Sequence, residues 1–313
     1  SSGDLWQYNS VSGEWEVSET WAEHFATSGG WSGALTSVAV SGSTIYVGGI
    51  VNQLGYSTDG GQTWSNISLT HRFGGDRMVA GIYTTGTQAY VLRQNGSTNL
   101  VVNGVEVPLD NSVPMGNTTF QNEGAKGIVG IGDHIWITNN ANSTGDPANT
   151  VRGSTTFGVG TNAWSSGVTA TGGGNFGGLF ALNEETLFKA GGNDTIGVST
   201  DGGASFSTLT LGMDAGTTRS VYGTEEGYLW VTSNVGLFYY DGEIWQDLTS
   251  NLIGYAGESL RGIYEADGYL WVTGNAGGIW MAVPEPSTVG LVGFAVAAAV
   301  AGSLRRRNGK MAL

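Results

Sequence analysis

The chain has no cysteine, and only 5 of its 313 residues are proline. No disulfide can therefore staple the fold, and a proline-rich disordered linker is excluded as well. Charged residues make up 12% of the chain, with 12 lysines and arginines against 26 acids. The resulting net charge of −14 disfavours nucleic acid and anionic membrane surfaces as partners. Stability must come from the core alone.

Glycine and the aromatic residues are abundant by contrast. The chain has 54 glycines, 11 tryptophans and 12 tyrosines. Disordered chains are poor in aromatic residues, whereas short aromatic stretches separated by glycine-rich turns are typical of β-strands. The composition therefore predicts an all-β fold.

A repeat runs through most of the chain. It is clearest in residues 217–250 and 258–283, which share an arginine, an acidic turn and the sequence Gly-Tyr-Leu-Trp-Val-Thr. Weaker copies occupy residues 35–67, 78–109, 126–165 and 179–211. Each copy is compatible with four strands, and a period of roughly 35–50 residues is that of a propeller blade. We therefore predict a single β-propeller over residues 1–283, with six blades preferred and seven left open.

The two ends of this region resemble parts of one blade. Asp4–Tyr8 and Gly13–Glu19 match the third and fourth strands of the repeat at Leu237–Leu248. The last repeat stops after two or three strands. We therefore expect the amino-terminal strands to complete the carboxy-terminal blade and to cover sheet edges that would otherwise be exposed.

The last 30 residues follow a different pattern. An uncharged apolar stretch, Val289–Leu304, is long enough for about 24 Å of helix and is followed by a basic stop at 305–310. The motif before the stretch and the arginines after it are Pro284, Glu285, Pro286, Arg305, Arg306 and Arg307. The basic residues would stay on the cytoplasmic side of a membrane. We predict a sorting tail over 284–313 with a transmembrane segment at 289–304.

This tail resembles the PEP-CTERM sorting signal. The resemblance implies an exported bacterial protein, anchored transiently in the inner membrane until an exosortase-like membrane peptidase cuts near Pro284–Pro286 and delivers it to the cell surface or extracellular matrix. The alternative is an ordinary anchor that is never cut. Because such a signal belongs on an exported chain, we also expect a signal peptide before Ser1 that this numbering omits.

Two segments resemble the Asp-box of BNR-type propeller repeats. Their key positions are Ser57, Asp59, Gly61 and Trp64 in one segment, and Ser199, Asp201, Gly203 and Phe206 in the other. Residues 240–245 look like a shortened relative. In such a motif the aspartate caps a hairpin turn, glycine adopts a positive φ and the aromatic ring packs on the sheet. We predict a structural role, between the outer two strands of a blade.

Three arginines and three tryptophans are candidates for binding. Arg77, Arg219 and Arg261 are expected at one repeat position, at the start of the innermost strand, where they would form an anion or uronate site. The alternative is that each arginine pairs with acids or carbonyls of a neighbouring blade. Trp21, Trp31 and Trp164 lie in predicted loops, where they would either stack on sugars or pack under the loops.

No catalytic, metal or cofactor motif is evident. The three histidines are isolated, and neither a zinc motif nor a calcium loop is present. Asp-boxes also occur in sialidases, but the arginines of this chain lack the sialidase context. We therefore expect a non-enzymatic scaffold or binding module for polysaccharide or matrix proteins; the alternative is a glycan-active hydrolase with a site at the propeller mouth.

Overall fold

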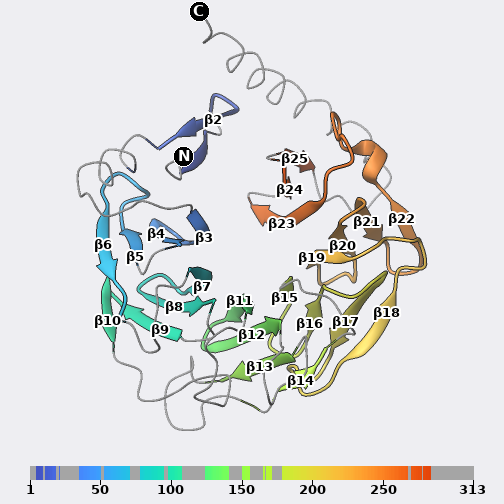
Figure 1. The fold of residues 1–313 in the computed structure, drawn as a ribbon, viewed down its shortest axis with the longest axis horizontal. Helices are drawn as coiled ribbons and strands as arrows, with labels where there is room; N and C mark the ends of the chain where they lie inside the picture. Colours follow the sequence, from blue (N-terminus) through green and yellow to red (C-terminus); the bar gives the residue numbers. More distant parts are fainter. Residues whose placement is uncertain are drawn as a thin grey trace, which may run out of the picture. The chain divides into compact units, whose positions relative to one another are not determined.

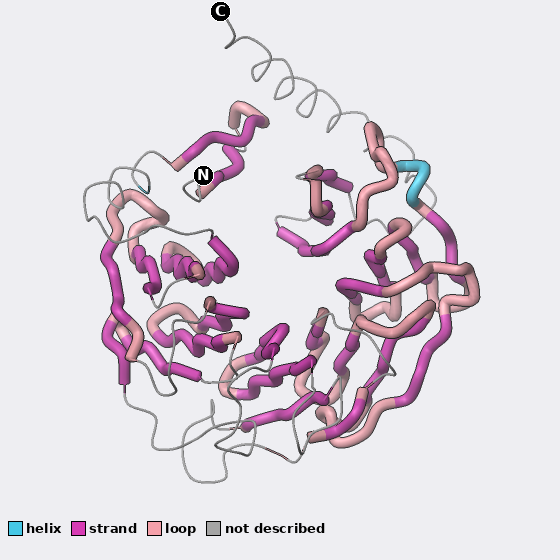
Figure 2. The backbone as a smooth tube through the Cα atoms, viewed as in Figure 1, coloured by secondary structure: helices cyan, strands magenta, loops and turns pink. Residues whose placement is uncertain are grey.

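The computed structural model describes residues 5–9, 11–18, 21, 35–50, 53–70, 78–94, 98–107, 124–140, 150–155, 165, 167–170, 178–266, 269–276 and 278–282. These ranges contain strands β1–β25 and a single-turn 3₁₀ segment, η1 (Thr249–Asn251). Figure 2 shows the described backbone as strands, in magenta, joined by loops and turns. The prediction of an all-β fold is confirmed.

The chain forms two compact units, residues 1–169 and 170–313. The first unit contains a two-stranded sheet of β1 (Trp6–Asn9) and β2 (Glu14–Val17), followed by three four-stranded sheets. These three are called the first, second and third blades. Their strands are β3 (Leu35–Ser41), β4 (Thr44–Gly49), β5 (Gln53–Ser57) and β6 (Ser65–Ser68); β7 (Val79–Thr84), β8 (Gln88–Arg93), β9 (Thr98–Val102) and β10 (Val105–Val107); and β11 (Gly124–Ile131), β12 (His134–Asn140), β13 (Thr150–Ser154) and β14 (Val168–Thr169).

The second unit contains the fourth, fifth and sixth blades. The fourth and fifth have four strands and the sixth has three. Their strands are β15 (Leu179–Ala181), β16 (Leu187–Lys189), β17 (Thr195–Ser199) and β18 (Ser207–Thr210); β19 (Thr218–Gly223), β20 (Leu229–Ser233), β21 (Leu237–Tyr240) and β22 (Trp245–Asp247); and β23 (Leu260–Ala266), β24 (Tyr269–Gly274) and β25 (Ile279–Ala282). Figure 1 follows the strands in chain order. Every pairing is antiparallel between consecutive strands, so each blade is a simple meander.

The core within each unit lies between consecutive blades. In the first unit, Tyr46 of the first blade packs in one cluster with Ile82 of the second, and Tyr90 of the second packs with Ile128 of the third. The blades approach closely where a side chain is missing, since a Cβ added at Gly81 would lie 2.7 Å from Cγ2 of Ile128. At each of these contacts, a large ring on the second strand of one blade packs against an aliphatic residue on the first strand of the next blade.

The second unit follows the same rule. Phe188 of the fourth blade shares a cluster with Val221 of the fifth, and Trp230 of the fifth shares one with Ile263 of the sixth. The second strand of the fifth blade, β20, is buried along its whole length because its alternating side chains face two neighbouring layers. The repeat read from the sequence is therefore the unit of packing.

The last blade ends with its third strand. β25 pairs with β24, as β21 pairs with β20 in the fifth blade. β1 and β2 pair with each other in a separate sheet. The completion of the last blade by the amino-terminal strands therefore stays a prediction, whereas the six repeated units are confirmed.

The sorting tail falls outside the described residues, including Pro284, Glu285 and Pro286, the stretch 289–304 and Arg305, Arg306 and Arg307. In the part of the chain that is described, no helix has the length and apolar character needed to cross a bilayer. The predicted transmembrane segment and domain boundary stay predictions.

Candidate functional site

The first Asp-box forms the turn between β5 and β6. The Ser57 hydroxyl donates to Asp59 Oδ1 at 2.8 Å and accepts the Gly61 N–H at 2.9 Å. The Thr63 N–H donates to Asp59 Oδ1 at 2.9 Å, and the Thr63 hydroxyl donates to Oδ2 at 2.5 Å. Gly61 adopts a φ of 88°, which favours glycine. The aspartate is committed to the turn.

The second Asp-box repeats this geometry between β17 and β18. Ser199 donates to Asp201 at 2.8 Å and accepts the Gly203 N–H at 2.8 Å. The Ser205 N–H and hydroxyl donate to the two Asp201 oxygens at 2.9 and 2.5 Å. Phe206 is half-buried at the position that Trp64 occupies in the first copy. The placement of both motifs between outer strands agrees with the prediction.

Hydrogen bonding explains the acidity of both aspartates. The Thr63 hydroxyl and then its N–H lower the pKa of Asp59 from 3.8 to about 2. Ser205 acts in the same way and lowers the pKa of Asp201 to about 2. A carboxylate stabilised by several donors is a weak base, so these aspartates are poorly suited to general acid–base chemistry.

Residues 240–245 form a related, shorter turn between β21 and β22. Asp241 Oδ1 accepts the N–H groups of Glu243 at 2.9 Å and of Ile244 at 2.8 Å. Trp245 packs on Tyr240 with ring centroids 5.0 Å apart. The predicted relationship to the Asp-box therefore holds for the aspartate and the aromatic residue.

Trp21 is not a surface residue. It is 2% exposed and packs edge-on against Trp64, with ring centroids 4.8 Å apart, in a cluster with Val47. Its apolar surface is buried against the first blade, including Trp64, the aromatic residue of the first Asp-box. Of the two alternatives for Trp21, the structure shows packing. Trp31 and Trp164 lie outside the described residues, so their roles stay predictions.

Two of the three candidate arginines occupy equivalent positions on neighbouring strands. The register of β19 shifts between Thr218 and Ser220, and that of β23 shifts between Leu260 and Gly262. Arg219 and Arg261 are thus the extra residues of two β-bulges. Bulges re-aim side chains and are common at functional sites. β19 and β23 are adjacent, so the two bulges lie on neighbouring first strands.

The charge of Arg261 acts on the Arg219 guanidinium. Partial burial, and after it the charge of Arg261, lower the pKa of Arg219 below its ordinary value. Arg219 is half-buried and Arg261 is exposed. On the same strand as Arg219, burial and then the charges of Glu265 and Glu226 raise the pKa of Tyr222. The fifth and sixth blades therefore bring two cations close together, and they place two carboxylates near the phenol of Tyr222.

Arg77 lies outside the described residues, so its predicted equivalence to Arg219 and Arg261 stays a prediction. The register shifts of the three earlier blades fall at Thr36, Ala80 and Lys126.

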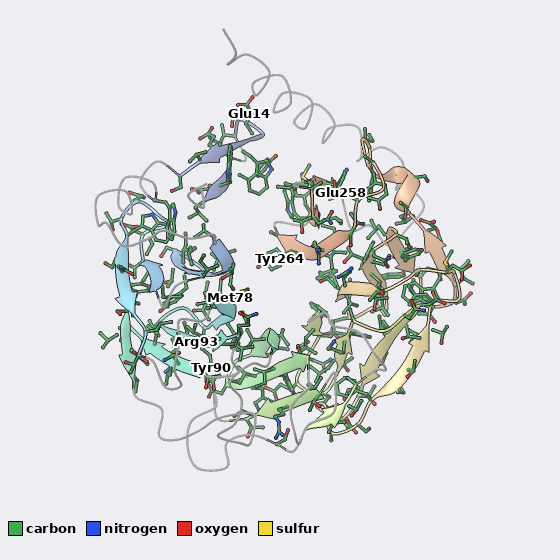
Figure 3. The ribbon with its side chains drawn as sticks, viewed as in Figure 1. Glu14, Met78, Tyr90, Arg93, Glu258 and Tyr264 are labelled. Atoms are coloured by element: carbon green, nitrogen blue, oxygen red, sulfur yellow. The ribbon has the colours of Figure 1, made fainter. Side chains whose placement is uncertain are left out.

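The remaining described arginines have local partners. Arg93 is 1% exposed and donates to the Thr70 carbonyl at 3.2 Å, while the Thr70 N–H donates to Glu106 at 2.8 Å. Arg93 belongs to the second blade, as labelled in Figure 3. Arg152 donates to the carbonyl of Ser165 at 2.9 Å. Arg93 thus bonds the segment that follows the first blade, and Arg152 bonds a residue between the last two strands of its own blade. No group of three His, Cys, Asp or Glu suited to a metal occurs among the described residues.

Lys189 is a site that sequence reasoning missed. It lies on β16 with no exposed surface, at the place that Val231 holds on β20. Its ammonium donates to the Ala190 carbonyl. Burial lowers its pKa from 10.5 to about 8. An alignment of residues 187–189, Leu-Phe-Lys, with residues 229–231, Leu-Trp-Val, would have predicted a charged side chain at a core position of the repeat.

The PEP-CTERM protein-sorting motif matches residues 282–307. This match covers the region that the sequence identified, including the Pro-Glu-Pro residues and the basic cluster. The motif implies an exported protein that an exosortase recognises and processes. A search of curated proteins found no relative of this chain.

Solved structures with similar backbones are β-propellers of varied function. YCF48 from Cyanidioschyzon merolae is 16% identical, with a TM-score of 0.56 over 79% of this chain and 81% of that one. A catalytically inactive virginiamycin B lyase from Staphylococcus aureus, solved with quinupristin, is 15% identical, with a TM-score of 0.56 over 79% of both chains. An ancestral GH74 enzyme is 15% identical, with a TM-score of 0.59 over 80% of this chain and 36% of that one.

These similarities show the fold alone, since every identity is below 25% and the group includes enzymes. The six repeated blades agree with it. The chain is an exported, all-β propeller protein of six blades that carries a PEP-CTERM sorting motif.

Proposed function

We propose that this protein is a non-enzymatic binding module that holds acidic polysaccharide at the cell surface or in the extracellular matrix. The supporting observation is the arginine pair on neighbouring bulges, close enough for Arg261 to lower the pKa of Arg219. The repulsion between two like charges costs free energy, and an anion bound between the two guanidinium groups would offset that cost. Guanidinium groups bind carboxylates with two parallel hydrogen bonds, which suits a uronate sugar.

The negative charge of the rest of the protein restricts binding of an acidic polysaccharide to the arginine pair. The chain carries a net charge of −14, so a polyanion is repelled from most of its surface. Binding at a single arginine pair in each molecule would be weak. Many copies displayed together would hold a long polysaccharide through multivalent contacts. In this proposal the segment 289–304 anchors the chain until the exosortase cuts near Pro284–Pro286, while Arg305–Arg307 stay cytoplasmic.

Calorimetry on the full-length protein tests the proposal. We expect oligogalacturonate to bind the wild type in low salt, and the double variant R219Q/R261Q to lose at least 10-fold in affinity, a change of about 1.4 kcal/mol. R152Q is the matched control because Arg152 bonds the Ser165 carbonyl in the other unit. Equal affinity in the double variant and R152Q would refute the site.

A glycan hydrolase is the second candidate, favoured by the similarity to an ancestral GH74 enzyme. Glu265 and Glu226, whose charges both raise the pKa of Tyr222, are the candidate carboxylates. An enzyme would release reducing ends from the polysaccharide, and E265Q or E226Q would abolish the release. Turnover with that dependence would replace the binding proposal.

A further inference from the structure

The last strand of the second unit ends beside the sorting motif. β25 ends at Ala282, where the match to the PEP-CTERM motif begins, and Pro284 follows two positions later. A fully extended chain spans at most about 3.5 Å per residue, so Pro284 lies no more than about 7 Å along the chain from the sheet. A peptidase cleft holds several residues on each side of the bond that it cuts. An enzyme that acts near Pro284 must therefore touch the folded blade.

Strand pairing shows at which end of the sixth blade the chain leaves. Ala282 stands opposite Leu270 on β24, and Leu270 stands opposite Glu265 near the end of β23. Neighbouring strands are about 4.8 Å apart, so Glu265 lies about 10 Å across the sheet from Ala282. The chain thus leaves the second unit at the end where the first strand of a blade turns into the second. We call this end, with the turns 183–186, 200–206, 224–228 and 241–244 of the two preceding blades, the exit end.

The turns of the fourth and fifth blades make the exit end acidic. Their exposed acids are Glu184, Glu185, Asp201, Glu225, Glu226 and Glu243. Glu226 of the fifth blade and Glu265 of the sixth both raise the pKa of Tyr222, so the turn that contains Glu226 lies near the strand row of Ala282. In the fourth blade, the Gly202 N–H donates to the Glu185 carbonyl at 2.8 Å, which joins its two acidic turns.

The basic residues of the second unit lie away from the exit end. Those that the structure describes are Lys189, Arg219 and Arg261. Lys189 is buried. Arg219 and Arg261 follow the first residues of β19 and β23, whereas the exit end is at the last residues of these strands. In the described part of the second unit, acids therefore surround the exit of the chain and the arginine pair lies at the opposite end.

We propose that the exit end is the surface on which the sorting peptidase docks, through a basic surface of its own, before it cuts the chain. Glu225 and Glu226, in the blade next to the sixth, carry the contact, because opposite charges speed association and orient the two partners. A membrane surface is the poorer occupant, since anionic lipid repels an acidic end. This inference rests on the processing near Pro284–Pro286 that the proposed function includes, and it extends recognition from the sorting tail to the folded domain.

The test follows cleavage of the full-length protein in vesicles that contain an exosortase. In phosphatidylcholine vesicles we expect E225Q/E226Q to be cut about 3- to 10-fold more slowly than the wild type, and E225K/E226K more slowly still. D214N/D247N is the matched control, because it removes the same number of charges from exposed residues that precede the first strands of the fifth and sixth blades. It should be cut at the wild-type rate. Equal melting temperatures show that the rates compare folded proteins.

A flexible insert separates docking from simple obstruction. A Gly/Ser segment of about 12 residues between Ala282 and Val283 moves the cut site away from the exit end. If the enzyme docks there, the insert should slow cleavage of the wild type, and E225Q/E226Q should then cause no further loss. If the blade only obstructs the enzyme, the insert speeds cleavage and E225Q/E226Q changes nothing, which overturns the inference.

The outcomes also separate this inference from the proposed function. If the wild type is cut and E225Q/E226Q is cut at the same rate, the docking surface is overturned and the processing stands. If the variant is slower only in vesicles that also contain phosphatidylglycerol, the exit end meets the membrane and not the enzyme, which again overturns the inference. If the wild type is not cut at all, the processing step and the docking surface fail together, while calorimetry on R219Q/R261Q still decides the glycan site.

Discussion

Replacing Lys189 tests the packing logic of the whole repeat. The side chain is fully buried on β16, where β20 has Val231 and β24 has Val272. Burial is the cause that lowers its pKa from 10.5 to about 8. The chain therefore keeps an ammonium group at a position that other blades fill with an aliphatic side chain.

The pKa gives the size of the penalty. One pKa unit corresponds to about 1.4 kcal/mol, so burying the charged lysine costs about 3 kcal/mol. Because the folded pKa lies below the unfolded one, the cost is fully present below pH 8. It diminishes as pH rises from 8 to 10.5, and it vanishes above 10.5, where the amine is neutral in both states.

K189M keeps the length of the side chain and removes the charge. We expect its free energy of unfolding at pH 7 to exceed that of the wild type by about 1–3 kcal/mol, since the variant avoids the desolvation cost but loses the bond to the Ala190 carbonyl. At pH 10 this difference in the free energy of unfolding between K189M and the wild type should be less than half as large. Urea titrations followed by tryptophan fluorescence measure both values.

V231M is the control, because it places methionine at the same repeat position of the next blade without changing charge. It reports the packing cost of methionine alone, typically about 1 kcal/mol, and its effect should not depend on pH. If K189M is less stable than the wild type and the difference is the same at pH 7 and pH 10, burial is not what sets the energetics of Lys189.

Two further predictions concern the first unit. D59N should lower the melting temperature by about 3 °C at pH 7, and the difference should disappear between pH 4 and pH 2, because the depressed pKa of Asp59 stabilises the fold only while the carboxylate is charged. Thermal scans of D59N against T63V, which removes one donor to the same carboxylate, should show the smaller loss for T63V. W21A should cost about 3–5 kcal/mol of unfolding free energy, because Trp21 packs on Trp64, and should leave oligogalacturonate affinity unchanged; an affinity loss with little change in stability would restore Trp21 as a sugar contact.

Local chemistry made the strands and turns predictable. The Asp-box geometry depends on groups within a few residues, such as Ser57, Asp59 and Thr63, so the spacing alone fixed the hydrogen bonds that the structure contains. The blade repeat was readable for a related reason. Its second strand must be apolar on both faces, and this requirement marks β20 and β24 in the sequence.

Longer-range features were not readable from the pattern. Trp21 looked like a loop residue because nothing in its own segment specifies the contact with Trp64, which is 43 positions away. The bulge at Ala80 could not be located either, because a bulge adds one residue to a strand and has no sequence signature strong enough to fix its place. Arg219 and Arg261 were aligned correctly because the flanking strands are nearly identical in sequence.

The boundary between fold and sorting signal bears on what the processed protein retains. β25 ends at Ala282, and the match to the sorting motif begins at the same residue. Trp280 on that strand is buried and donates to the Ile253 carbonyl at 3.1 Å, which holds β25 to the blade. A cut at Pro284 or beyond therefore leaves every described strand and every described core residue in place. Arg219 and Arg261 stay on their strands after processing, so the proposed glycan contact would operate at the destination to which the motif sends the protein.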